Sequence, residues 1–409
     1  MKIALLGYGK EGKSAEQYFK SHFKNIKIDI FENLTPGEFQ QINYSPYDII
    51  LRSPSIPPIP NQPKLTSLTR YFFDHCPCPI IGVTATKGKG TTCSFIKSLL
   101  DAHGEDAYLV GNIGTPAIEI LDQLTPNSVV VYEMSSFQLW DLTKSPHIAV
   151  VGIIEPDHLN VHKDFNEYTS AKANIARWQT ENDYLIYYSN NPDSKRIARE
   201  GNAIKIPYPF EVPKDILDSI TLPGQHNQDN AIAAISAVAS YKNISPNEYL
   251  SEYSSTVKAG LASFHGLPHR LEFLRELNNV KYYDDNFSTN IGSTRVAINA
   301  FPKNNLVVII GGRDKTDNAD LPEIYEALAG KNIKNIILIG ESGHELATRY
   351  QDPRFVVSES LEEAVSTAKK HAEQYTDSIV LMSPSAASFD MFKNVYDRGG
   401  QYKKMVMNF

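Results

Sequence analysis

The chain has 409 residues, which is long for a single hydrophobic core, so we expect two or three domains. Its composition, 42% hydrophobic and 21% charged, is that of a globular protein and excludes wholesale disorder. Forty Lys and Arg against 47 Asp and Glu give a formal net charge of −7 without a basic run, which argues against nucleic acid as the main partner.

The three cysteines, Cys76, Cys78 and Cys93, form no metal-binding pattern. Cys76 and Cys78 are too close in sequence to bridge easily, so a reducing compartment fits best. The N-terminus turns polar before the apolar region of a signal peptide could develop. No apolar run approaches the roughly 20 residues of a membrane helix. We therefore expect a cytoplasmic protein that makes no membrane contact. A monomer is expected as well, although none of these features determines the oligomeric state.

The N-terminal part alternates apolar runs with helical segments. Strands are predicted at residues 3–6, 26–31 and 48–51, with a helix opening in the glycine-containing turn 7–14. This βαβ pattern predicts a parallel sheet, and hence a Rossmann-like domain over residues 1–78. The turn and the acidic Glu32 after the second strand would alone suggest NAD. That fingerprint is weak by itself, because a strand–turn–helix of this form binds any diphosphate.

Two further α/β units follow. The central one, residues 79–267, has a glycine-rich turn at 84–92 and a small-residue helix at 227–240, with strands predicted at 80–83, 129–132, 148–154 and 184–188. The last one, residues 268–409, has helices predicted at 322–329 and 361–372, and strands at 280–283, 306–310, 336–339 and 379–382. The expected fold is α/β in three domains: Rossmann-like, P-loop-type ATPase with a mainly parallel sheet, and Rossmann-like.

The strongest chemical signal is the glycine-rich turn, which consists of Thr86, Lys87, Gly88, Lys89, Gly90, Thr91 and Thr92. A strand, a glycine turn and a helix direct backbone N–H groups at one point, where they bind phosphate. Lys89 adds positive charge, and Thr91 or Thr92 can offer a hydroxyl to Mg²⁺. A solvated loop with incidental lysines is the alternative, and the strand–helix context disfavours it. Gly90 departs from the common P-loop by separating Lys89 from the first hydroxyl.

This turn resembles the ATP loop of the superfamily of Mur ligases and folylpolyglutamate synthases, and Gly90 is more like the folate branch. Eight further segments resemble the Mur ligases, in order along nearly all of the chain: 111–114, 133–139, 155–159, 171–172, 224–230, 268–272, 311–315 and 383–390. Each match is moderate alone, and together they are specific. The chain therefore resembles the Mur ligase family, and within it the branch that adds D-glutamate.

The resemblance implies an ATP-dependent ligase that joins D-glutamate to UDP-N-acetylmuramoyl-L-alanine in peptidoglycan precursor synthesis. In that reaction a substrate carboxylate attacks the γ-phosphorus of ATP, and the amine of D-glutamate then attacks the acyl-phosphate. The implied cofactors are ATP and Mg²⁺ at two sites. No covalent protein nucleophile is required, so positioning and charge neutralisation carry the catalysis.

Four residues are predicted to be catalytic: Lys89, Glu133, His158 and Lys172. Glu133 ends an apolar strand, and a parallel sheet presents ligand-binding groups at that end of its strands. Because the phosphate loop is expected there too, we interpret Glu133 as a Mg²⁺ ligand rather than a solvated glutamate. A single histidine is more often structural, and only the resemblance makes His158 a second metal ligand. Lys172, on a helix predicted at 168–178, would ordinarily be exposed. The matching family lysine is carbamylated, which replaces a cation with an anion beside Mg²⁺. The predicted metal set is Thr91, Glu133, His158 and Lys172.

More nucleotide ligands are expected outside the loop. Asn227 and Asn230 share a helix face and could hold adenine or ribose, although two Asn residues near a helix start could equally be caps. Arg270 and Asp285, at the start of the third domain, match family residues that contact phosphate and ribose.

The incoming amino acid, with two carboxylates, needs cations and hydroxyl or backbone donors. Lys315 supplies the cation; Thr289, Ser388 and the Phe389 backbone fit the other roles, unless these are ordinary loop residues. Phe287 stands where relatives usually carry a lysine that binds the glutamate side chain. Either Lys315 does more of that binding, or the enzyme adds a different amino acid.

The first domain is expected to receive the UDP end of the sugar substrate. The predicted contacts are Gly9, Lys10, Glu32, Ser53, Asn112 and Ser135. The loop that begins at Ser53 resembles the family's Ser-Pro-Gly loop, with Ser55 in place of the glycine.

Several alternatives remain open. A folylpolyglutamate synthase-type ligase predicts activity on a pterin with L-glutamate, and a sister Mur ligase predicts another amino acid. A nicotinamide-dependent dehydrogenase predicts NADH binding. A non-catalytic nucleotide-binding module predicts no turnover of ATP with both co-substrates.

Overall fold

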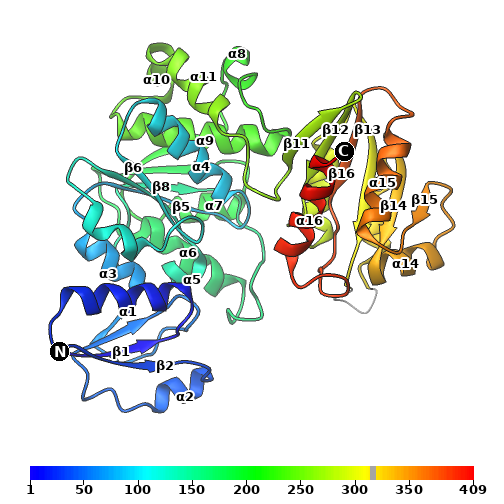
Figure 1. Ribbon diagram of the computed structural model, residues 1–409. Coiled ribbons are helices and arrows are strands. Elements are labelled where there is room, and N and C mark those ends of the chain that lie inside the picture. The colour runs from blue at the N-terminus through cyan, green and yellow to red at the C-terminus, as the bar shows by residue number, and fades with distance from the viewer. Residues whose placement is uncertain (314–318) are drawn as a thin grey trace. The chain divides into compact units, whose positions relative to one another are not determined.

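The computed structural model describes residues 1–313 and 319–409. By their internal contacts these residues form two compact units. Unit 1 comprises residues 1–220 and 228–264, and unit 2 comprises residues 221–227 and 265–409. Unit 1 contains two sheets and unit 2 contains one (Figure 1).

The first sheet has four parallel strands in the order β2-β1-β3-β4. The strands are β1 Lys2–Leu6, β2 Lys27–Phe31, β3 Ile49–Arg52 and β4 Leu65–Ser67. The helices of this part are α1 Lys10–His22, α2 Pro36–Gln41 and α3 Leu68–His75. Separate apolar clusters involve α1 and α3 on the one hand and α2 on the other, so the sheet has two covered faces.

The second sheet has six parallel strands in the order β10-β9-β8-β5-β7-β6. The strands are β5 Ile80–Thr84, β6 Ala107–Gly111, β7 Val129–Glu133, β8 Ile148–Val151, β9 Tyr184–Tyr188 and β10 Ile204–Tyr208. The helical segments are α4 Lys89–Ala102, η1 Ala117–Gln123, α5 Ser136–Leu139, α6 Phe165–Arg177, α7 Pro192–Ile197, α8 Lys214–Leu217, α9 Gln225–Tyr241, α10 Pro246–Glu252 and α11 Ser254–Ser263. In Figure 1, α9, α10 and α11 lie on one side of this sheet, and α5 and α6 lie on the other.

The third sheet has six strands in the order β11-β12-β16-β13-β14-β15, of which only the β11–β12 pair is antiparallel. The strands are β11 Glu272–Leu277, β12 Val280–Asp284, β13 Asn305–Gly311, β14 Ile333–Ile339, β15 Phe355–Val357 and β16 Ser378–Met382. The helices are α12 Ile291–Asn299, α13 Leu321–Ala327, α14 Gly340–Arg349, α15 Leu361–Ala372 and α16 Val395–Met407. Apolar clusters with α12 to α14 and with α15 and α16 cover its two faces.

The central strands explain why this sheet arrangement forms. Every residue of β5, β7 and β8 is buried, as expected for parallel strands covered on both faces. The carboxyl ends of these neighbouring parallel strands meet at one edge, so the residues that follow them are brought together. Among the predicted catalytic residues, Lys89 follows β5, Glu133 is the last residue of β7, and His158 follows β8.

The predicted α/β class with mainly parallel sheets is confirmed. The strand predicted at 148–154 corresponds to β8, which ends three residues earlier, at Val151. The helix predicted from residue 168 begins three residues earlier, because the Asp164 side chain accepts a hydrogen bond from the Glu167 N–H and caps its start. The three-domain boundaries at 78/79 and 267/268 stay a prediction.

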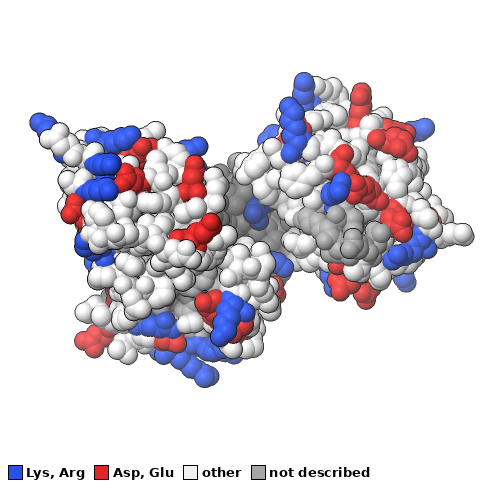
Figure 2. Space-filling view, turned by 90° about the horizontal axis from the view of Figure 1, so that it is seen from below, with Lys and Arg blue, Asp and Glu red and all other residues white. Residues whose placement is uncertain are grey.

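The surface carries both signs of charge. On the face shown in Figure 2, Lys and Arg side chains are interspersed with Asp and Glu. Among the described residues, no helix is both long and apolar enough to cross a membrane.

Candidate nucleotide and metal site

The predicted phosphate loop joins β5 to α4. Gly88 caps α4 with a φ of +83°, and a Cβ added there would lie 2.6 Å from the Oδ1 atom of Asn230. A side chain at this position would therefore be both strained and obstructed. Asn230, on α9, also accepts a hydrogen bond of 3.2 Å from the Thr92 hydroxyl. In the described part of the chain no side-chain cap is found at the start of α4, so its first N–H groups and the helix dipole favour an anion.

Two lysines converge on one backbone carbonyl behind this loop. Lys89 Nζ donates to the Ala85 oxygen at 2.9 Å and to the Thr86 oxygen at 3.1 Å. Lys172 Nζ, on α6, donates to the same Ala85 oxygen at 2.9 Å and to the Thr84 hydroxyl at 3.2 Å. Two of the four predicted catalytic residues are therefore neighbours, although 83 positions separate them in the chain.

Lys172 is only 1% exposed, not the surface lysine that its sequence context suggested. Burial lowers the pKa of its amine well below the ordinary value, and the charge of Lys89 lowers it further. Asp157 and Glu133 act in the opposite direction but do not restore that value. The amine also lies 4.8 Å from the centroid of the Tyr168 ring. Lys172 is therefore a buried amine that favours its neutral form.

Glu133, the last residue of β7, is 3% exposed. Its Oε1 atom accepts a hydrogen bond of 3.3 Å from the Asn112 side-chain amide. Its buried Oε2 atom has no hydrogen-bond partner among the residues that the structure describes. An unpartnered buried carboxylate oxygen is costly, which makes this atom a candidate for a cationic ligand.

His158 lies in the loop after β8 with a φ of +54°, and its side chain is about half exposed, at 49%. One turn later, His162 is buried, and its Nδ1 atom has no hydrogen-bond partner in the described part of the chain. The Phe137 ring connects the two, with its centroid 5.0 Å from that of His158 and stacked at 5.3 Å on that of His162. Burial lowers the pKa of His162. Sequence reasoning missed His162, and its spacing of four residues from His158 was the available signal.

Other loop residues make contacts within unit 1. The Thr86 hydroxyl accepts from the Glu155 N–H at 2.9 Å, and it lies 2.9 Å from the Tyr168 hydroxyl. Lys87 is 3.5 Å from the Glu155 carboxylate. Thr91 is half-buried in the first turn of α4. The loop is thus attached to the segment that follows β8, which carries His158.

The predicted sugar-binding residues divide into two groups. Gly9 caps α1, Glu32 follows β2 at the surface, and Lys10 Nζ donates to the Gly114 oxygen at 3.1 Å, near the exposed Asn112. Two serine hydroxyls are already used in the fold. Ser53 donates to the Gly7 oxygen at 2.8 Å, and Ser135 caps α5. Gly9, Lys10, Glu32 and Asn112 are therefore the predicted sugar-binding residues that lie at the surface.

Arg52, which sequence reasoning also missed, is fully buried beside Ser53. Its guanidinium makes two hydrogen bonds to the Asp141 carboxylate, at 2.5 and 3.2 Å, and donates to the Ile56 oxygen at 2.5 Å. Arg52 therefore ties the loop that begins at Ser53 to the chain just after α5.

Asn227 and Asn230 both belong to α9 but differ in surroundings. Asn227 lies in unit 2, where its side-chain amide donates to the Pro223 oxygen at 2.7 Å. Asn230 lies in unit 1, against Gly88. Asn230 therefore lies at the predicted phosphate loop.

The remaining predicted residues lie in unit 2. Asp285 is buried, which raises the pKa of its carboxyl to about 7 even though it accepts hydrogen bonds from Ser383 and Leu271. The Ser388 hydroxyl is buried without a partner among the described residues, whereas the Phe389 side chain is 69% exposed. Thr289 is half-buried just before α12. Lys315 lies outside the described residues.

A buried arginine supports the Ser388 loop and was not predicted. Arg398, on α16, is fully buried and donates to the backbone oxygens of Ala386 and Ala387 at 3.1 and 3.2 Å. It also donates to the Asn286 side chain at 2.5 Å. Burial lowers the pKa of this guanidinium to about 10. Arg398 thus fixes the backbone on which Ser388 sits.

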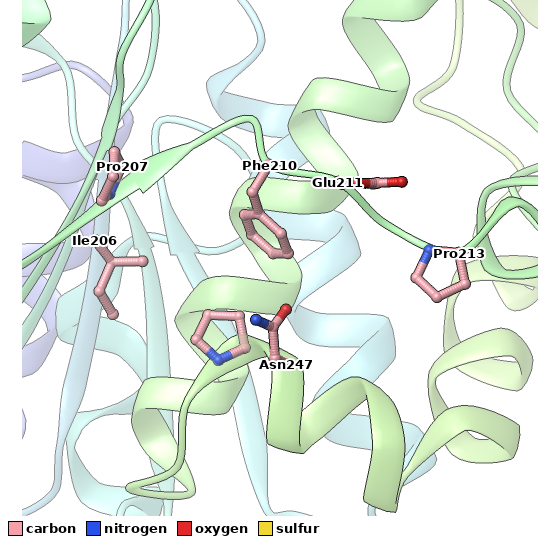
Figure 3. A pocket seen from close by; sticks show the side chains of 7 residues that line it. Ile206, Pro207, Phe210, Glu211, Pro213 and Asn247 are labelled. Atoms are coloured by element: carbon pink, nitrogen blue, oxygen red, sulfur yellow. The ribbon is translucent and has the colours of Figure 1, made fainter.

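A cavity of about 570 Å³ in unit 1 contains none of the predicted site residues. It lies beside the edge strand β10 and is lined by Ile206, Pro207, Phe210, Glu211, Pro213, Pro246 and Asn247. In Figure 3 the Phe210 ring points toward Asn247, at the start of α10. This cavity is separate from the phosphate loop, which follows β5 in the centre of the sheet.

The fold and site define an α/β protein with a glycine-rich loop at a helix N-terminus, a buried lysine, and a buried glutamate with one oxygen that has no hydrogen-bond partner among the described residues. Family models agree with this class: the Mur ligase middle domain matches residues 83–217, and the Mur ligase, glutamate ligase domain matches residues 269–386. The chain belongs to the Mur ligase family and is an ATP-dependent amide-bond-forming ligase.

Its relatives include UDP-N-acetylmuramoylalanine--D-glutamate ligases. That of Acetivibrio thermocellus is 32% identical, with 96% of this chain and 90% of the relative covered. That of Clostridium botulinum is 30% identical, with 99% and 96% covered. The resemblance inferred from the motifs is confirmed.

Solved structures support the fold. MurF ligase from Thermotoga maritima in complex with ADP is 16% identical, with a TM-score of 0.60 over 88% of this chain and 90% of that one. The UDP-N-acetylmuramate-alanine ligase MurC from the same organism is 15% identical, with a TM-score of 0.58 over 100% and 99%.

Proposed function

We propose that the chain joins D-glutamate to UDP-N-acetylmuramoyl-L-alanine with ATP, in peptidoglycan precursor synthesis. The full-length relatives named for this reaction support the choice of substrates. The observation that carries the chemistry is that Lys89 and Lys172 bond to the same Ala85 oxygen behind the start of α4, with the Glu133 carboxylate close enough to act on the charge of Lys172. Phosphate-binding, cationic and anionic groups in one place suit phosphoryl transfer.

In the first step the alanyl carboxylate attacks the γ-phosphorus of ATP, the bond to the ADP oxygen breaks, and an acyl-phosphate forms. The N–H groups at the start of α4 and the Lys89 ammonium neutralise charge on the transferring phosphate. In the second step the amine of D-glutamate attacks the acyl carbon, loses a proton and releases inorganic phosphate. The residues named here bind and orient the reactants, and none forms a covalent bond to them.

The donor set fits Mg²⁺, because Glu133 has a buried carboxylate oxygen without a partner among the described residues, and carboxylates are ligands that Mg²⁺ prefers. Glu133 and the Thr91 hydroxyl would hold one ion, and His158 with a modified Lys172 would hold the second. When bound, Mg²⁺ supplies positive charge that neutralises the phosphate oxygens.

Lys172 is proposed to carry a carbamate. Carbon dioxide reacts with a neutral amine: a bond forms between the amine nitrogen and the carbon, and the amine loses a proton. The lowered pKa of Lys172 favours that neutral form. The nearby Lys89 cation would stabilise the anion that results, and a carbamate supplies the carboxylate-type oxygen that a second Mg²⁺ needs.

The test is phosphate release with ATP, UDP-N-acetylmuramoyl-L-alanine and a panel of amino acids. We expect stimulation by D-glutamate and by no other member. Preference for another amino acid would indicate a sister ligase, and stimulation by a pterin substrate with L-glutamate would indicate the folate branch. Either result would contradict the proposed substrates while leaving the ligase class intact.

A further inference from the structure

Arg270, just before β11, presents its guanidinium at the surface of unit 2. The side chain is exposed, and its Cζ atom lies 5.4 Å from the centroid of the Phe287 ring. Among the described residues no carboxylate forms an ion pair with it. A cation that rests on an aromatic face and is not neutralised within its own unit is suited to an anionic ligand.

The Phe287 ring is itself held by other rings. His269 stacks on it with centroids 5.8 Å apart and an interplanar angle of 30°. Tyr396 meets it edge-on at 5.2 Å and 80°. The Phe287 N–H also donates to the His269 oxygen at 3.1 Å. The ring therefore has few alternative positions, and the Arg270 guanidinium lies over it.

A buried carboxylate anchors this arrangement. Asp284 is fully buried, and its Oδ2 atom is 2.7 Å from His269 Nδ1. The His269 N–H donates to Glu272 at 3.0 Å, and Glu272 is paired with Lys403. The backbone φ of His269 is +62°, a strained value that persists only where the surroundings impose it.

His269, Glu272 and Asp284 each have a possible metal-ligand atom, and these three atoms lie within 4.8 Å of one another, which resembles a metal site. The hydrogen bond between His269 and Asp284 and the ion pair between Glu272 and Lys403 already use His269 Nδ1, Asp284 Oδ2 and Glu272 Oε1. Gly399 packs so closely that an added Cβ would lie 2.5 Å from His269 Nδ1. These contacts favour a structural anchor over a cation site.

We propose that Phe287, clamped by His269 and Tyr396 and anchored through Asp284, is a positioning residue that holds the Arg270 guanidinium ready for the phosphates of the nucleotide. This rests on the proposed function, in which ATP is the substrate. A planar guanidinium stacks on a ring face and keeps its N–H donors directed outward. Restricting its motion before binding lowers the entropy lost when the nucleotide binds.

The experiment compares Phe287→Leu with Phe287→Tyr in the full-length enzyme. Loss of the ring should raise the KM for ATP about fivefold, as expected from a cation–π contact of this kind. We expect kcat and the KM for D-glutamate to change less than twofold, and Phe287→Tyr to restore the wild-type value. Phe273→Leu, which changes an exposed ring that lies tilted against Tyr283 with centroids 5.5 Å apart, is the matched control and should leave the KM for ATP unaltered.

A double-mutant cycle with Arg270→Ala tests whether Phe287 acts through Arg270. If it does, adding Phe287→Leu to Arg270→Ala should not raise the KM for ATP further. Equal fivefold effects in both backgrounds would overturn the proposal, as would a Leu variant that raises the KM for D-glutamate instead. Titration calorimetry with ATP needs no turnover, so it reads the same affinities even if the substrates proposed above are wrong. A wild-type enzyme inactive with D-glutamate would refute only the proposed function.

Discussion

Replacing Lys172 by alanine is the sharpest perturbation of the proposed site. The side chain is 1% exposed and its amine bonds to Ala85 and Thr84, so the substitution removes one buried group without changing the surface. Losing one preorganised charged contact to the reacting groups costs about 3 kcal/mol, or roughly 10²–10³-fold in kcat. We expect a loss of that size in phosphate release with all three substrates present.

The alanine variant leaves room where the side chain was, so added acetate or formate should restore part of the activity. Lys172→Met, which fills that room, should be equally inactive and should not respond to either. Nuclear magnetic resonance with ¹³C-labelled bicarbonate should show a carbamate carbon in the wild type and none in the Met variant. An alanine variant with full activity would refute the reasoning, and so would a wild type without the labelled carbon.

The depressed pKa of Lys172 also has a consequence for stability. Between that pKa and the ordinary lysine value, the unfolded chain binds a proton that the folded protein does not. The free energy of unfolding of the wild type should therefore rise with pH across that window, and the rise should be smaller for Lys172→Met. The comparison is made in buffer free of carbon dioxide, where the amine is unmodified. A steeper rise for the Met variant would contradict the inferred neutral amine.

Three further predictions follow from the geometry. Glu133→Gln replaces a buried carboxylate whose Oε2 atom has no hydrogen-bond partner among the described residues. We expect kcat to fall at least about 100-fold while the melting temperature stays the same or rises; a lower melting temperature would mean that the carboxylate stabilises the fold. Gly88→Ala places a Cβ 2.6 Å from an amide oxygen at positive φ and should cost about 1–3 kcal/mol in urea unfolding, whereas Gly37→Ala, with nothing within 4 Å, should cost none. The Asp285 carboxyl has a pKa of about 7 in the folded protein, against 3.8 for the ordinary group. Between these values the folded protein binds a proton that the unfolded chain does not, so the free energy of unfolding falls as pH rises. Asp285→Asn should remove that fall in denaturation measured from pH 4 to pH 7.

Much of the fold was predictable because buried parallel strands are continuous apolar runs. The predicted strand at 184–188 agrees with β9, and those at 80–83 and 129–132 each fall one residue short of β5 and β7. Sequence reasoning missed β4, β6, β10, β11 and β15, which are short or contain partly exposed and polar residues. Their pairing depends on neighbours that local periodicity does not reveal.

Within the site, the phosphate loop could be read locally because its glycines and lysines are consecutive. The burial of Lys172 could not, because it arises where α6 packs behind β5, far away in sequence. The same holds for Arg52 and Arg398, which bond to Asp141 and Asn286, each far away in sequence. A sequence shows which residues can do chemistry, and only the packing shows which have been withdrawn from solvent.

The relatives support a ligase of this specificity. Phe287 stands where the family resemblance leads us to expect a lysine. The Arg270 guanidinium lies over its ring, so under the proposal above the ATP affinities report on Phe287 and the amino-acid panel reports on substrate selection. A shift in one without the other would separate substrate selection from nucleotide positioning.

The acyl-phosphate is the central chemical claim, and isotope transfer tests it most directly. UDP-N-acetylmuramoyl-L-alanine labelled with ¹⁸O in both oxygens of its alanyl carboxylate is incubated with ATP, D-glutamate and the enzyme, and the released phosphate is analysed by mass spectrometry. The account predicts one ¹⁸O atom in each phosphate, because a carboxylate oxygen bridges to phosphorus and leaves with it. Unlabelled phosphate, released at the rate of product formation, would contradict it.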